Sequence, residues 1–181
     1  MLNWKPENAE MYEDVQTRYN YAHTNLNKSD EVRLKKMWRS SRDSARTPVQ
    51  WDDTENAGFT TGTPWFYVNR NYKQINVAQQ EQDPDSILNF YRKAIALRKE
   101  LKAVRFGTFR EHFRLSNQQY VYSLCAQGQR VLVVCAFCDK ETKLRLPKGF
   151  DLRSAKLVLQ THSNDGDTLK PYESRVYLWE E

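Results

Sequence analysis

Histidine, cysteine and glycine are scarce in this chain of 181 residues, which contains three, three and six of them. A Ser-His-Asp or Cys-His site needs a histidine beside its nucleophile, but His23, His112 and His162 stand in unrelated contexts. The sequence also lacks a metal-binding cluster, a glycine-rich phosphate loop and a nucleophile elbow. By itself, the sequence therefore contains no complete active site.

Long runs of one charge and long apolar runs are missing too. The 28 basic and 23 acidic side chains give a net charge of +5, which is mild and argues against a nucleic-acid partner. The longest apolar run, Val131 to Phe137, is far too short to cross a bilayer. The N-terminal MLNWKPENAE has neither the charged nor the apolar region of a signal peptide. We expect a soluble, cytoplasmic chain with no membrane and no nucleic-acid partner.

The three cysteines are an odd number, which suits a reducing compartment. Cys135 and Cys138 have the CAFC spacing of some redox and zinc sites, but they fall within VLVVCAFC, which predicts a strand. Residues three apart in a strand point to opposite faces, so this pair cannot easily share a metal. We expect structural cysteines, no metal and no cofactor.

Helical patterns dominate the first hundred residues. A helical spacing of apolar residues covers 7–22, and Ser29 followed by two acidic residues predicts the N-cap of a second helix that reaches toward Trp38. The clearest helix has Asp83 as N-cap and Pro84 at its first position, and it ends near Leu101. Its apolar stripe consists of Ile87, Tyr91, Ala94 and Ile95.

Beyond residue 104 the pattern alternates with the period of a strand. The candidate strands, separated by turn residues and with no helix between them, are 108–113, 120–126, 130–138, 142–146, 156–160 and 174–179. This spacing favours an antiparallel sheet or sandwich. The predicted fold class is α+β, with the boundary between the helical and the β part at about 102–106.

A long loop between the helical patterns, SRDSARTPVQWDDTENAGFTTGTPWFYVN from Ser41 to Asn69, concentrates reactive side chains. Arg42 and Arg46 offer planar forks of donors that suit a carboxylate or paired sugar hydroxyls, and a tryptophan such as Trp51 offers an apolar face for a pyranose ring. The same spacing also suits an internal ion-pair network of Arg42, Asp43 and Arg46 that pins the loop. The pattern alone leaves both readings open.

This loop, followed by NYKQINV and DPDSILNFYRKAIALRK, closely resembles the C-terminal third of α-glucosidases of glycoside hydrolase family 13. Within that family it is most similar to the oligo-1,6-glucosidase, dextran glucosidase and trehalose-6-phosphate hydrolase group, whose motif is typically RDNARTPMQWD. The sequence departs from it by Ser44 for Asn and Val49 for Met, both mild changes. The resemblance is strong over residues 40–102 and looser elsewhere, although LKPYESRVYLW also resembles the last strand of the group.

The resemblance implies a (β/α)8 barrel followed by a C-terminal antiparallel β-sandwich domain. It assigns residues 1–102 to the end of the catalytic barrel, as the loop from strand 8 to helix 8 (1–82) and helix 8 itself (83–102), and residues 104–181 to the β domain. Such enzymes are retaining hydrolases of α-glucosidic bonds in small gluco-oligosaccharides, and by the resemblance their catalytic carboxylates lie N-terminal to the region seen here. We therefore expect no catalytic residue in this chain and no activity of the chain alone.

The resemblance also implies roles in the loop. The arginine of the RTP motif, here Arg46, is expected to reach the glucose pocket, pair with an acidic residue and donate to sugar hydroxyls, with Arg42 as the second candidate. Asp43 is expected to orient the arginines, and Trp51 to pack the loop onto the barrel. The substrate would be an α-glucoside oligosaccharide, if the rest of the enzyme is present.

Two further expectations concern binding. One alternative from another class is a non-catalytic β-domain module, residues 104–181, that binds carbohydrate or a partner protein. The other is self-association, because the stripe of helix 83–101 would lie exposed without a barrel beneath it, and burial of apolar surface is favourable by about 25 cal/mol per Å².

Overall fold

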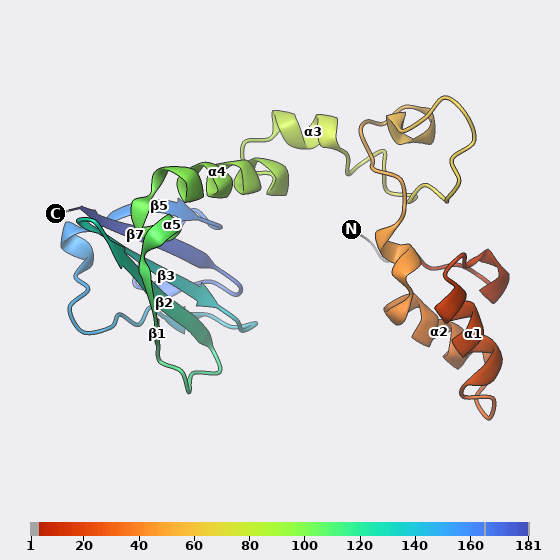
Figure 1. Cartoon of the computed structure of the whole chain (residues 1–181), viewed down its shortest axis with the longest axis horizontal. Helices are drawn as coiled ribbons and strands as arrows, with labels where there is room; N and C mark the ends of the chain where they lie inside the picture. The colour runs from red at the N-terminus through yellow and green to blue at the C-terminus, as the bar shows by residue number, and fades with distance from the viewer. Residues whose placement is uncertain (1–3, 165, 181) are drawn as a thin grey trace. The chain divides into compact units, whose positions relative to one another are not determined.

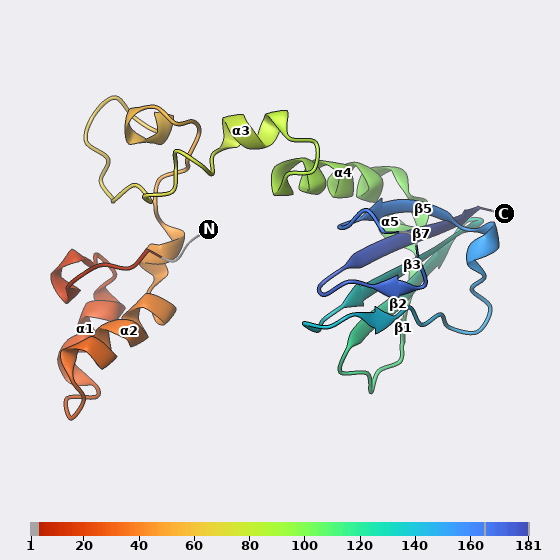
Figure 2. The same ribbon diagram turned by 180° about the vertical axis from the view of Figure 1, so that it is seen from behind.

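The computed structural model describes residues 4–164 and 166–180 and divides into two compact units, which meet between Ser86 and Ile87. The helices of the first unit are α1 (Val15–His23), α2 (Asp30–Ser40) and α3 (Val77–Gln82). The 3₁₀ turn η1 (Ala9–Met11) precedes α1, and the 3₁₀ turns η2 (Arg42–Ala45) and η3 (Glu55–Gly58) lie between α2 and α3. The second unit contains two helices and the strands (Figures 1 and 2).

The helices α1 and α2 form a hairpin in the first unit. The carboxylate of Asp14 caps α1 by accepting a hydrogen bond from the Thr17 backbone N–H at 3.1 Å. Asp30 and Glu31 occupy the first turn of α2, where negative charge interacts favourably with the helix dipole and stabilises the helix. The single helix expected over 7–22 is wrong: a 3₁₀ turn capped by Asn8 is followed by extended backbone, and α1 begins only after the Asp14 cap.

The long loop is held in shape by three successive residues with left-handed backbone, Asn56, Ala57 and Gly58, with φ of 54°, 58° and 64°. The Ala57 carbonyl accepts hydrogen bonds from the N–H groups of Trp51 at 2.9 Å and Asp52 at 3.3 Å. At Gly58 a Cβ atom would lie 2.6 Å from the Asp52 carboxylate, so no larger residue fits without a shift. The backbone of the AGFT part of the loop therefore has a defined conformation, although its sequence lacks the spacing of apolar residues that is typical of a helix or a strand.

The second unit is built on a five-stranded antiparallel sheet with the order β1-β2-β3-β7-β5 and a small sheet, β4-β6. The strands are β1 (Thr108–His112), β2 (Gln119–Ala126), β3 (Gln129–Ala136), β4 (Thr142–Lys143), β5 (Lys156–Gln160), β6 (Thr168–Leu169) and β7 (Ser174–Glu180). The expected strands all exist, although 142–146 is shortened to β4 and β6 was not expected. The α+β fold class with an antiparallel β part is confirmed.

The two faces of the five-stranded sheet bury separate apolar clusters, because alternate residues of each strand point to opposite sides. One face packs Leu132, Val134 and Tyr177 with Leu169 of the small sheet. The other face packs Val131 and Leu178 against the helix α5 (Lys102–Phe106) and its flanking Leu101.

Helix α4 spans Ile87–Glu100. Its expected start at Asp83 is wrong, because the Asp83 side chain accepts from the Asp85 N–H at 2.9 Å and holds a turn before the helix begins. Leu97 packs on the cluster that contains Leu101, and the boundary between the two compact units falls before α4. The expected domain boundary at about 102–106 stays a prediction. The assignment of residues 1–102 to the end of the catalytic barrel stays a prediction.

Candidate functional site

The three charged residues expected in the loop lie on and beside the short turn η2, which directly follows α2. Ser41 caps this turn, since its hydroxyl accepts a hydrogen bond from the Asp43 N–H at 3.2 Å. The turn brings Arg42, Asp43 and Arg46 together with the start of α1, about thirty residues earlier in the sequence. The structure therefore assembles the three residues, and it adds a fourth, Asp14.

Asp43 is fully buried and ties the loop to the backbone before α1. Its Oδ2 accepts hydrogen bonds from the backbone N–H groups of Glu13 at 2.8 Å and Asp14 at 2.9 Å. Its Oδ1 lies 3.5 Å from Nη1 of Arg46 and, among the described residues, accepts no hydrogen bond. The orienting role expected for Asp43 stays a prediction, and its Oδ1 is a buried carboxylate oxygen without a hydrogen bond in the described structure.

Asp14 is the counter-ion of the arginines, and the sequence analysis did not predict it. Its Oδ2 accepts from the Thr17 hydroxyl at 2.6 Å, and its Oδ1 accepts from Nε of Arg42 at 2.9 Å and also from the terminal nitrogen of Arg42. Burial raises the pKa of Asp14, but the hydrogen bonds from Thr17 and Arg42 outweigh this effect and hold the pKa below its usual value. Asp14 is therefore a carboxylate at neutral pH.

Arg46 is held more loosely than Arg42. Its Nη1 lies 3.8 Å from Oδ1 of Asp14 and 3.5 Å from Oδ1 of Asp43, and in the described part of the chain its guanidinium makes no shorter hydrogen bond. Its side chain is 40% exposed, in front of two carboxylates that are almost completely buried. Arg46 thus has a fixed location but several free donors, whereas Arg42 is committed to Asp14.

An aromatic cluster adjoins the charged residues. Tyr12 is fully buried, and both burial and the charge of Asp43 raise its pKa, so its hydroxyl stays neutral. The Trp4 ring packs edge-on against Tyr12 with centroids 5.4 Å apart, and it stacks on Tyr67 at 5.3 Å. This side of the site is therefore apolar.

Trp51 contributes through its backbone, because its carbonyl accepts from the Ala78 N–H at 2.9 Å. Its side chain is half exposed, so the expected packing onto a barrel stays a prediction.

The cysteines and the acidic residues form no second chemical centre in the described part of the chain. Cys125, Cys135 and Cys138 are free thiols, and burial raises the pKa of Cys135. The expected position of Cys138 within strand β3 is wrong, because β3 ends at Ala136 and Cys138 lies in the turn that follows. Among residues 4–164 and 166–180 no three His, Cys, Asp or Glu side chains gather as a metal site, and no helix there could cross a membrane.

Comparison with known proteins identifies the class to which this fold and site belong. The family model described as Alpha amylase, catalytic domain, matches residues 7–107, which is more than half of the chain. The chain belongs to the alpha-amylase family, glycoside hydrolase family 13, in the group of oligo-1,6-glucosidases and trehalose-6-phosphate hydrolases. The resemblance inferred from the loop motif is confirmed.

The similar proteins are all much longer than this chain. An oligo-1,6-glucosidase of Halalkalibacterium halodurans is 36% identical over 98% of the chain, and a probable oligo-1,6-glucosidase 2 of Bacillus subtilis is 38% identical over 98%. The crystal structure of Bacillus licheniformis trehalose-6-phosphate hydrolase superposes with a TM-score of 0.91 over the whole chain at 34% identity. The chain spans about a third of each relative, namely 33%, 33% and 34% of their lengths.

Proposed function

We propose that this chain supplies the C-terminal third of a retaining α-glucosidase that cleaves α-glucosidic bonds of small gluco-oligosaccharides. It contributes one wall of the glucose pocket and lacks the catalytic carboxylates. The observation that carries the proposal is the loosely held Arg46, whose donors stay free in front of the buried Asp14 and Asp43. The free thiols support a reducing, cytoplasmic location.

We propose that Arg46 positions the sugar ring of the substrate. The two fixed carboxylates hold the guanidinium near this wall by charge and leave its planar fork free to donate to neighbouring sugar hydroxyls. Beside it, Oδ1 of Asp43 is buried and accepts no hydrogen bond among the described residues. Arg42 acts through Asp14, since it neutralises and holds that carboxylate.

Two measurements test this proposal. The purified chain should hydrolyse p-nitrophenyl α-glucoside no faster than a blank without protein. A chimaera that joins the chain to the N-terminal two thirds of the Halalkalibacterium halodurans oligo-1,6-glucosidase, in place of that enzyme's own last third, should hydrolyse isomaltose. Robust turnover by the chain alone, or a folded but inactive chimaera, would contradict the proposal.

A second function, carbohydrate binding by the β unit, is favoured by a line of aromatic rings across β1, β2 and the turn after β3. The Phe109 and Tyr122 centroids are 5.4 Å apart, those of Tyr122 and Tyr120 5.5 Å, and those of Tyr120 and Phe137 6.4 Å. All but Tyr122 are exposed. Successive rings are tilted against each other, which gives a twisted platform on which consecutive sugar rings could stack.

Titration calorimetry with isomaltose and dextran tests this second function. Saturable heat that disappears in the Tyr120→Ala, Phe137→Ala double variant would support it. A wild-type chain that releases no heat of binding at millimolar sugar would rule it out.

We also propose that the chain alone self-associates through α4. Ile87, Tyr91 and Ile95 lie on one stripe of the helix and are 74%, 63% and 49% exposed. We expect light scattering after size-exclusion chromatography to detect dimers or larger species, and the Ile87→Gln, Ile95→Gln variant to elute as a monomer. A wild-type chain that stays strictly monomeric at 100-fold different loading concentrations would refute this.

A further inference from the structure

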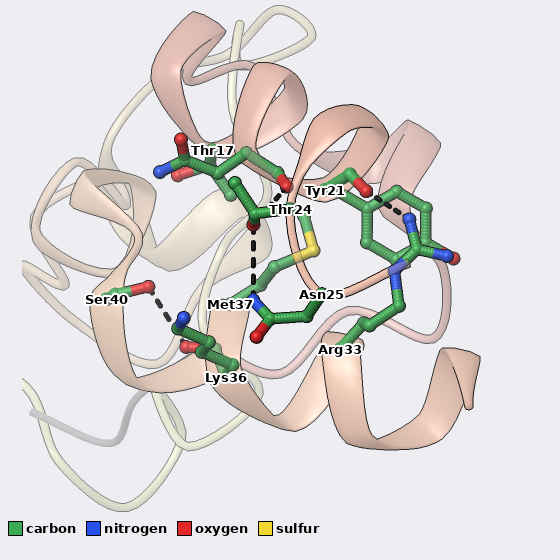
Figure 3. Close-up of a pocket in the computed structure, with 9 residues that line it drawn as sticks. Thr17, Tyr21, Thr24, Asn25, Arg33, Lys36, Met37 and Ser40 are labelled. Atoms are coloured by element: carbon green, nitrogen blue, oxygen red, sulfur yellow. Dashed lines mark hydrogen bonds between the residues drawn. The ribbon is translucent and has the colours of Figure 1, made fainter. Parts of the chain in front are cut away.

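A cavity of about 160 Å³ lies between α1 and α2 (Figure 3), and Arg42, Asp43 and Arg46 are not among the residues that line it. Its lining comes from α1, the connecting turn and the side of α2 that faces α1: Thr17, Asn20, Tyr21, Thr24, Asn25, Arg33, Lys36, Met37 and Ser40. The volume is well below the roughly 300–1,000 Å³ of pockets for drug-sized ligands, so the cavity suits a small group.

The charge of this lining has one sign. It contains Arg33 and Lys36 but no acidic residue. Asp30 binds Nη1 of Arg33 at 2.9 Å and neutralises part of that charge. Lys36 is exposed and makes no ion pair among the described residues, so its ammonium is available to an anion at the cavity.

Arg33 is fixed in place and retains an unused donor. Its guanidinium carbon lies 4.1 Å from the centre of the Tyr21 ring, and a terminal nitrogen donates to the Tyr21 carbonyl. Its side chain is only 14% exposed, and its buried Nε–H has no acceptor in the described structure. A buried donor without an acceptor is uncommon, and an anion is the kind of acceptor that it lacks.

Asn25 completes the polar wall. Its backbone is left-handed, with φ of 56°, and its amide nitrogen donates to the Thr24 hydroxyl at 3.2 Å. The Thr24 hydroxyl is itself bonded to the Asn20 carbonyl at 2.6 Å, which closes α1. The amide and hydroxyl groups therefore stand in fixed places around the two cations.

We propose that the α1–α2 cavity binds a phosphate group, free or carried by a small sugar, through Lys36, Arg33 and Asn25. A compact anion with several acceptor oxygens matches two cationic side chains and an amide in a space of this size. The inference does not depend on the proposed hydrolytic function, because it concerns different residues of the same unit.

The test is titration calorimetry of the full chain with potassium phosphate, glucose 6-phosphate and glucose, at an ionic strength held constant with potassium chloride. We expect saturable binding of the two phosphates with one site per chain, and no comparable binding of glucose. A tighter complex with glucose 6-phosphate identifies a sugar phosphate as the ligand, and equal affinities identify the phosphate group alone.

Neighbouring lysines of α2 provide a matched control. Lys36→Gln should weaken phosphate binding by about tenfold, because it removes one charge-assisted contact. Lys35→Gln should leave it unchanged, because Lys35 pairs with Glu31 at 2.5 Å and does not line the cavity. Asn25→Gly, which keeps the left-handed backbone without strain, should weaken it by about 2–10-fold. The absence of saturable binding, equal losses in the two lysine variants, or equal binding of glucose and glucose 6-phosphate would overturn the proposal.

Discussion

Replacing Arg46 by glutamine in the chimaeric enzyme is expected to lower kcat/KM for isomaltose by about 10²-fold. The substitution removes the planar fork that we propose aligns the glucose ring, and misplaced substrates lose rate as well as affinity. Steady-state kinetics with isomaltose measure the effect. Arg46→Lys keeps the charge without the fork and should recover less than half of the lost activity on a logarithmic scale.

The matched control is Arg39→Gln on the exposed side of α2, which removes the same charge a short distance away in the sequence. It should keep the activity of the unsubstituted chimaera. Full activity of the Arg46→Gln chimaera, with circular dichroism that confirms folding, would show that Arg46 has no role in substrate positioning.

The largest effect on stability is expected from Glu173→Gln, which should lower the free energy of unfolding by about 3–5 kcal/mol. Glu173 and Arg175 are almost completely buried, and Nε of Arg175 donates to Oε1 of Glu173 at 2.6 Å. The other donors of Arg175 bind the carbonyls of Gly166 at 2.6 Å and Thr168 at 2.7 Å. The variant leaves the Arg175 charge buried without its counter-ion. Urea unfolding followed by circular dichroism measures the loss.

The control for this variant is Arg153→Gln, which removes an ion pair with Asp151 that lies at the surface. Exposed ion pairs are screened by water, so the unfolding midpoint should not change measurably. If Glu173→Gln unfolds at the same urea concentration as wild type, the buried pair does not stabilise the β unit.

The parts of the fold that follow from local pattern could be predicted from the sequence. The strand at Val131 to Ala136 was found because it is a short apolar run next to a Gln-Gly turn, and in the structure its residues point alternately to two buried faces. The start of α2 was found because Ser29 precedes two acidic residues. β6 was missed because a strand of two residues has no period, and its place depends on pairing with β4.

The charged site was predicted only in part, for a related reason. Arg42, Asp43 and Arg46 are close in sequence, and their motif indicated their importance. Asp14 carries the local signal of an N-cap, but its pairing with an arginine 28 residues away depends on tertiary packing. Glu173 and Arg175 did have a usable signal, since residues two apart in extended chain share a face and opposite charges there can pair.

The place of β7 in the sheet affects when the β unit can fold during synthesis. β7 pairs with β3 on one side and β5 on the other, although it is the last of the strands along the chain. Until residues 174–180 leave the ribosome, β3 and β5 each present an unpaired edge, which invites aggregation. Translation proceeds at about 5–20 residues per second, so the nascent β unit spends seconds in this state. Pairing of β7 with β3 and β5 is therefore the step that ends this exposure and completes the sheet.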